Sequence, residues 1–241
     1  MSLAVRIVQV DVPAGHLDRT VAFWSAALSA RPVTAPGGFV HLLEATSAVE
    51  VHVQPIGTDD GRLHLDLVAD DRDVEVERLE GLGATTVARF DDGYTVIEDP
   101  AGLQLCVIDG DAAEVNPLCD AIDGRGHLGA VFLDVPEEHV DGEVAFWSAA
   151  LAVDAGAPQG AYVPLRGVVA ASGDPLDLEV QTVGSASRIH VDLAAPDVDA
   201  EVVRLVALGA RRVGVHEDWV TLSDPCGNLL CVVPTEGHTS R

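Results

Sequence analysis

The sequence of 241 residues contains no lysine, so all 14 of its basic residues are arginines, and they stand against 39 aspartates and glutamates. The formal net charge of −25 repels phosphate backbones and anionic lipid headgroups, which argues against nucleic acids and membranes as partners. No apolar run approaches the roughly 18 residues of a membrane-spanning helix. The N-terminus also lacks a charged segment followed by a cleavage site. We therefore expect a cytoplasmic protein with an acidic, solvated surface.

Cysteine is also scarce. The four cysteines are irregularly spaced, which excludes a disulfide framework and a Cys-x-x-Cys zinc clip. They are Cys106, Cys119, Cys226 and Cys231. Hydrophobic residues make up 48% of the chain, so a chain of this length has enough apolar surface to bury the cores of two ordinary domains.

The most informative feature is an internal repeat. The segment Ala22–Leu28 returns letter for letter as Ala145–Leu151. Three further motifs return in the same order and almost without gaps: His64-Leu65-Asp66-Leu67 as His190-Val191-Asp192-Leu193, Leu82-Gly83-Ala84 as Leu208-Gly209-Ala210, and Asp99–Val107 as Asp224–Val232. The chain is therefore a tandem duplication. We expect one domain over residues 1–110, a linker over 111–126 and a second domain over 127–236.

Each half divides again into two βαβββ modules. A mostly apolar strand comes first, followed by an amphipathic helix and three short β-rich runs. The modules run at about 5–56, 62–108, 128–183 and 187–234. On the first helix the pattern predicts a buried face, formed by Leu17, Val21, Trp24 and Leu28. On the second helix it predicts another, formed by Val74, Val76, Leu79 and Leu82. The acidic residues of the second and fourth helices are expected to be solvated; they are Glu75, Glu77, Glu80, Asp197, Asp199 and Glu201.

These motifs resemble the vicinal oxygen chelate superfamily, which contains glyoxalase I, bleomycin-resistance proteins and extradiol dioxygenases. The resemblance rests on the paired βαβββ modules, the helical Phe-Trp, the His-x-Asp-Leu strand and the Asp-Pro-x-Gly hairpin. It covers nearly the whole chain. It implies an α+β fold in which the four modules pair into two domains with curved mixed sheets. It also implies a divalent metal, when one is present, held by side chains from the first and last strands of the modules.

Carried over to the first half, the resemblance implies a metal set of Gln9, His52 and His64. Glu50, His52 and Gln54 alternate along one strand and share a face, and which of them faces the cleft stays open. If a neighbouring side chain orients His64, we expect Glu50 or His52 to do so rather than Asp66, whose side chain is placed one pleat away. The family's metal-binding Glu is replaced by Cys106. A thiolate there, together with His64, suits zinc, whereas in its apolar neighbourhood a cysteine is more commonly a small core residue.

The second half departs further from the family pattern. Phe132, which cannot bind a metal, stands where a first-strand ligand is expected, and Cys231 again replaces the Glu. His190 recurs, and Trp219 matches Tyr94 at a place that can line a cleft. We therefore expect the active site, if there is one, in the first half.

Three functions remain open at this point, of which the first is favoured and the third is a structural or regulatory module without a ligand. The first is binding of a small, partly apolar molecule in the cleft of the N-terminal domain, with Gln9, His52, Gln54, His64, Tyr94, Cys106, His190 and Trp219 as candidate binding residues. The second is a metal-dependent lyase, isomerase or dioxygenase that uses Zn, Ni, Fe or Mn, with Glu50 and His64 as catalytic candidates. The expected assembly is a monomer whose two halves imitate a dimer, or a homodimer.

Overall fold

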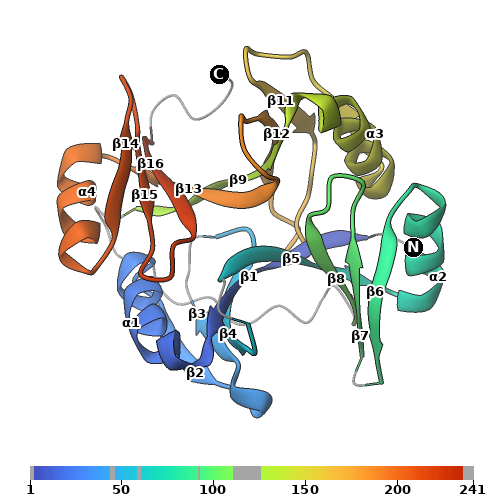
Figure 1. The fold of residues 1–241 in the computed structure, drawn as a ribbon, viewed down its shortest axis with the longest axis horizontal. Coiled ribbons are helices and arrows are strands. Elements are labelled where there is room, and N and C mark those ends of the chain that lie inside the picture. Colours follow the sequence, from blue (N-terminus) through green and yellow to red (C-terminus); the bar gives the residue numbers. More distant parts are fainter. Residues whose placement is uncertain (1–2, 44–46, 59–60, 92, 111–125, 236–241) are drawn as a thin grey trace. The chain divides into compact units, whose positions relative to one another are not determined.

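The computed structural model describes residues 3–43, 47–58, 61–91, 93–110 and 126–235. Along these ranges the predicted order of one strand, one helix and three strands occurs four times (Figure 1). Cys119 and nearly all of the predicted linker lie outside the described residues. The strands are β1 (Ala4–Pro13), β2 (Arg31–Thr34), β3 (Val40–Leu43), β4 (Glu50–Ile56), β5 (Arg62–Ala69), β6 (Thr85–Phe90), β7 (Tyr94–Glu98), β8 (Gln104–Asp109), β9 (His127–Val135), β10 (Asp154–Ala155), β11 (Tyr162–Arg166), β12 (Asp177–Thr182), β13 (Arg188–Ala195), β14 (Arg211–Val215), β15 (Val220–Ser223) and β16 (Leu229–Pro234). The helices are α1 (Leu17–Ala27), α2 (Arg72–Gly81), α3 (Val140–Leu151) and α4 (Val198–Ala207).

The strands form two mixed sheets of eight. The first has the order β2-β3-β4-β1-β5-β8-β7-β6, and the second repeats it as β10-β11-β12-β9-β13-β16-β15-β14. Within each sheet the outer strands pair antiparallel, whereas β5 and β8, like β13 and β16, pair parallel. Parallel central strands are buried on both faces, and every residue of β5 after Arg62 is buried accordingly. The predicted α+β class is confirmed. The domain boundaries at 110 and 127 stay a prediction.

Local signals explain where the helices begin and end. Asp71 and Asp197 each accept a hydrogen bond from a backbone N–H in the first turn of α2 and α4, at 3.1 and 3.0 Å, as N-cap residues do. Gly83 and Gly209 follow the same two helices with φ of +112° and +114°. Glycine adopts this region without steric cost, so it ends the helix.

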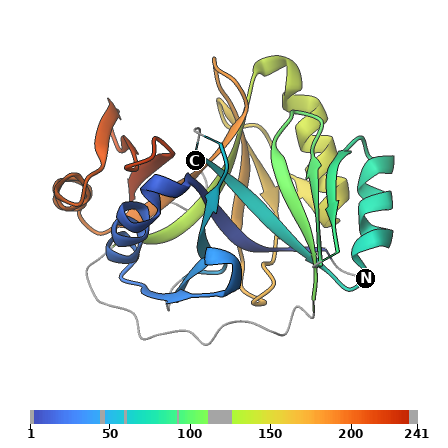
Figure 2. The same ribbon diagram turned by 60° about the horizontal axis from the view of Figure 1, so that its bottom comes forward.

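The buried faces of the helices differ from the prediction. On α1 the fully buried residues are Thr20, Phe23, Trp24 and Ala27, whereas Leu17 and Val21 are only half-buried. On α2, Val74 is 45% exposed while Glu75 is 5% exposed. Figure 2 shows α2 lying along β6, β7 and β8. None of the helices in the described ranges is long and apolar enough to span a membrane.

The buried glutamates correct the prediction that the acidic helix faces are solvated. Glu75 pairs with Arg78 and Glu201 pairs with Arg204, one helical turn away. The same arginines reach the C-terminal carbonyls of another helix. Arg204 donates to the carbonyl oxygens of Ala26 and Ala27 at 2.8 Å. A carboxylate is buried here because it orients a guanidinium that satisfies a helix end.

Tertiary contacts divide the chain into two compact units that each combine modules from both halves. One unit consists of the described parts of Met1–Val8, His64–Val115 and Val131–Ile189. In it, the α3 residue Trp147 donates its indole N–H to Asp99 at 3.2 Å and to Glu143 at 2.9 Å. Burial raises the pKa of both carboxyl groups, and the nearby Asp99 carboxylate helps to raise that of Glu143 to about 9.

The other unit consists of the described parts of Gln9–Leu63, Asn116–Ala130 and His190–Arg241. Here the indole N–H of Trp24 donates to Asp224 at 3.0 Å, and the amide of Asn228 donates to the same carboxylate oxygen at 3.0 Å. The position that Glu143 holds in the first unit is held here by Thr20, whose hydroxyl lies 3.0 Å from the sulfur of Cys226. The prediction that Trp24 packs in the core is confirmed, because it is 1% exposed, and its counterpart Trp147 in the second repeat is 0% exposed.

Candidate metal centre

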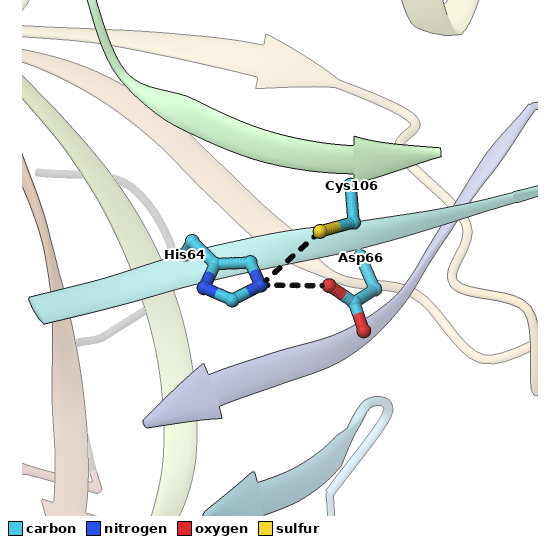
Figure 3. A group of neighbouring side chains, drawn as sticks. All are labelled: His64, Asp66 and Cys106. Atoms are coloured by element: carbon cyan, nitrogen blue, oxygen red, sulfur yellow. Dashed lines mark hydrogen bonds and ion pairs between the residues drawn. The ribbon is translucent and has the colours of Figure 1, made fainter. Parts of the chain in front are cut away.

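Three side chains with metal-binding atoms meet on the parallel strands β5 and β8. His64 and Asp66 lie two residues apart on β5, so they share a face of the sheet. The register pairs Asp66 directly with Cys106 on β8, which places the thiol on that same face. Figure 3 shows the imidazole, the carboxylate and the sulfur turned toward one another.

The distances are those of a compact donor cluster. The Nε2 atom of His64 lies 3.0 Å from Oδ1 of Asp66 and 3.5 Å from Sγ of Cys106. All three residues are buried. Sequence reasoning had placed Asp66 one pleat away from His64 and favoured Glu50 or His52 as its partner. That prediction is wrong, because residues i and i+2 of a strand project from the same face.

Two of the contacts that the His64 imidazole makes favour chelation over nucleophilic catalysis. In a Cys-His-Asp relay the acid orients one ring nitrogen while the other nitrogen activates the thiol. Here both neighbours approach the same atom, Nε2 of His64. Three donors that converge on one point are suited to a shared cation.

The donor set fits zinc. Zinc accepts histidine nitrogen, cysteine sulfur and carboxylate oxygen, and two of its ligands at tetrahedral angles lie roughly 3.3–3.6 Å apart. The observed 3.5 Å between nitrogen and sulfur agrees with that spacing, whereas the 3.0 Å between nitrogen and oxygen is a hydrogen-bond distance that lengthens when a metal binds between the two atoms. A thiolate also favours zinc over the harder manganese ion, so the sulfur of Cys106 is the donor that discriminates between metals.

The other first-half candidates have partners of their own. Nε2 of His52 lies 2.9 Å from Glu50, and its ring stacks on His41 with centroids 3.9 Å apart. Gln54 donates to Oδ1 of Asp11 at 2.5 Å. Membership of Glu50, His52 and Gln54 in the metal site stays a prediction.

Gln9 is the predicted ligand on β1. Its side chain is 2% exposed, and its Nε2 has no hydrogen-bond partner within the part of the chain that the structure describes. An unsatisfied buried amide needs an explanation, such as a ligand or an ordered water. Its role in binding also stays a prediction.

The aromatic candidates stack on neighbours rather than standing alone. Tyr94 stacks on Phe90 with ring centroids 4.4 Å apart, and Trp219 stacks on His216 at 4.3 Å. In the second half His190 and Cys231 are both buried, and they belong to a group that repeats the first.

Sequence reasoning missed the acidic members of both groups. The sequence does contain a signal for them, because the His-x-Asp motif occurs in both repeats and ends at Asp66 and at Asp192. Two arginines at the starts of β5 and β13 also pair with buried carboxylates. Arg62 lies 3.0 Å from Asp11, and Arg188 lies 2.9 Å from Asp134.

Known proteins with this fold include glyoxalases and dioxygenases. The chain matches the structure of a Mn(II)-bound glyoxalase from Novosphingobium aromaticivorans at 16% identity and a TM-score of 0.69, over 98% of this chain and 83% of that one. It matches a 2,2',3-trihydroxybiphenyl 1,2-dioxygenase from Sphingomonas wittichii at 14% identity and a TM-score of 0.61, over 100% and 95%. It matches a homoprotocatechuate 2,3-dioxygenase from Arthrobacter globiformis at 13% identity and a TM-score of 0.63, over 97% and 80%. At these identities the likeness concerns the fold alone.

The family is established by sequence. No curated protein matches the chain. The family model of the glyoxalase-like domain matches it twice, at residues 8–108 and 130–233. These two matches cover most of the chain. The chain therefore belongs to the glyoxalase-like domain family, in two tandem copies, within the vicinal oxygen chelate superfamily.

Proposed function

We propose that the protein is a metal-dependent member of its superfamily that holds a zinc-type divalent ion on His64, Asp66 and Cys106. The supporting observation is the convergence of Oδ1 of Asp66 and Sγ of Cys106 on Nε2 of His64. The proposal selects the lyase, isomerase or dioxygenase alternative over metal-free binding. The predicted ligand stays a small, partly apolar molecule in the N-terminal half.

The residues of the centre have distinct roles. His64 supplies a neutral nitrogen, while Asp66 and Cys106 supply charge that compensates a divalent ion. When bound, such an ion polarises adjacent oxygen atoms of a substrate. The burial of all three side chains limits competition from water, which strengthens electrostatic interactions within the centre.

Metal analysis of the full-length protein, purified without a histidine tag, tests this proposal. We expect bound zinc after equilibration with Zn²⁺. We also expect the content to fall by one ion per chain in His64→Ala and in Cys106→Ala. The matched control is Cys226→Ala, which removes a half-buried thiol outside the group and should leave the content unchanged. Protein that takes up no zinc but binds an apolar molecule saturably would overturn the proposal in favour of metal-free binding.

A second variant tests the role of the sulfur in metal selection. Cys106→Glu restores the carboxylate that the family carries at this position. A hard oxygen donor favours Mn²⁺ relative to Zn²⁺, so the ratio of the two dissociation constants should shift toward manganese. Circular dichroism establishes that the variant is folded. An unchanged ratio in the folded variant would show that Cys106 is not a ligand.

A further inference from the structure

The second half carries a group of the same composition that sequence reasoning had set aside. His190 and Asp192 lie on β13, and Cys231 lies opposite Asp192 on the parallel strand β16. Nε2 of His190 is 3.6 Å from Oδ1 of Asp192. Donor atoms from all three residues lie within 4.8 Å of one another, and all three side chains are buried.

The surroundings of the sulfur differ between the two groups. In the first half the strand residue paired with Cys106 is Val96, whose side chain has no hydrogen-bonding group. In the second half the residue paired with Cys231 is Thr221. Its hydroxyl lies 3.5 Å from Sγ of Cys231 and 3.4 Å from Nε2 of His216. A hydroxyl beside a ligating sulfur orients it and supports its thiolate form.

An aromatic side chain packs beside the same cysteine. Trp219 packs against a small buried cluster of Ala194, Cys231 and Val233. The indole also stacks on His216 at an interplanar angle of 12°. Binding of a metal ion at Cys231 would therefore alter the environment of the indole.

We propose that His190, Asp192 and Cys231 form a second, independent site for a thiophilic divalent cation such as Zn²⁺. The family arrangement takes ligands from both modules of a domain, whereas this group comes entirely from the two strands β13 and β16 of one module. Phe132 therefore need not contribute a ligand. Three protein ligands leave a tetrahedral ion one open position. The two groups share no residue, so the second proposal does not depend on the first.

The first test is the zinc stoichiometry of the tag-free, full-length protein after dialysis against Zn²⁺. We expect two ions per chain in the wild type and in the control Cys226→Ala. We expect one ion in Cys231→Ala, one in Cys106→Ala and none in the double variant. If Cys231→Ala is unfolded by circular dichroism, Asp192→Asn removes a different ligand and should also reduce the content to one.

The second test uses the indole beside the site. Zn²⁺ should change the fluorescence of the wild type and of Cys106→Ala but leave that of Cys231→Ala unchanged. Trp219→Phe should lose this signal while it retains two ions. Thr221→Val, which copies the other repeat, should weaken zinc binding at this site by about tenfold or more.

The outcomes separate the two proposals. One ion per chain, lost in Cys106→Ala and retained in Cys231→Ala, overturns the second site and leaves the first. One ion that is lost only in Cys231→Ala overturns the first and supports the second. Protein that binds no zinc overturns both.

Discussion

The buried carboxyl groups Asp99 and Glu143 predict an unusual dependence of stability on pH. Glu143 is 0% exposed and Asp99 is 5% exposed, and both accept the indole N–H of Trp147. The perturbation is Glu143→Gln. The amide oxygen still accepts the bond from Trp147, but the side chain no longer ionises.

The sign follows from the pKa of Glu143, which burial and the carboxylate of Asp99 raise from 4.5 to about 9. Between these values the folded state retains a proton that the unfolded state has released. The free energy of unfolding therefore falls as the pH rises through this window, by at most about 1.4 kcal/mol per pH unit for one proton. Between about pH 6 and about pH 8 this amounts to at most about 3 kcal/mol. Burial also raises the pKa of Asp99, which acts in the same direction at lower pH, before its carboxylate is ionised.

The assay is urea unfolding followed by circular dichroism across that pH range. The wild type should lose stability relative to Glu143→Gln as the pH increases. Glu77→Gln, which alters an exposed carboxylate of α2, should run parallel to the wild type. Parallel pH dependence of wild type and Glu143→Gln would refute the reasoning, because it would mean that Glu143 does not hold its proton in the folded state.

Three further predictions concern the second unit and are read from urea unfolding at neutral pH. Arg204→Ala should lower the free energy of unfolding by about 2–3 kcal/mol, since it leaves the buried Glu201 without its guanidinium partner. An effect near zero would mean that the interaction between Arg204 and Glu201 does not stabilise the fold. Gly209→Ala should cost about 1–2 kcal/mol because φ there is +114°, whereas an unaffected variant would argue against that conformation. Trp24→Phe should cost about 1–2 kcal/mol through loss of the hydrogen bond to Asp224, and a variant as stable as the wild type would show that this bond contributes nothing.

Sequence reasoning succeeded where the information is local. Hydrophobic periodicity predicted the four modules, because the formation of strands and helices depends mainly on neighbouring residues. The residues that begin and end α2, Asp71 and Gly83, are local signals of the same kind. It failed at Glu75 and Glu201. An acidic residue on a helix is normally solvated. These two are buried because each pairs with an arginine, Arg78 or Arg204, that donates to backbone carbonyls 71 to 178 residues away in the chain.

The candidate centres show the same division. The repeat identified His64 and His190 as positions that both copies retain, and it identified Cys106 and Cys231 as the replacements for the family's glutamate. It did not predict that Asp66 completes the first group. The strand pattern does place Asp66 on the face of His64, so that residue was within reach of sequence analysis.

The sequence by itself determined that the protein is a duplicated pair of βαβββ modules, and which residues are available to its chemistry. Only the tertiary structure decided that Cys106 lies beside His64, which is 42 residues away in the chain. It also decided that each compact unit combines modules from both halves. The reason is physical. Periodicity reports which face of an element is buried, whereas the register of two parallel strands depends on packing between distant segments.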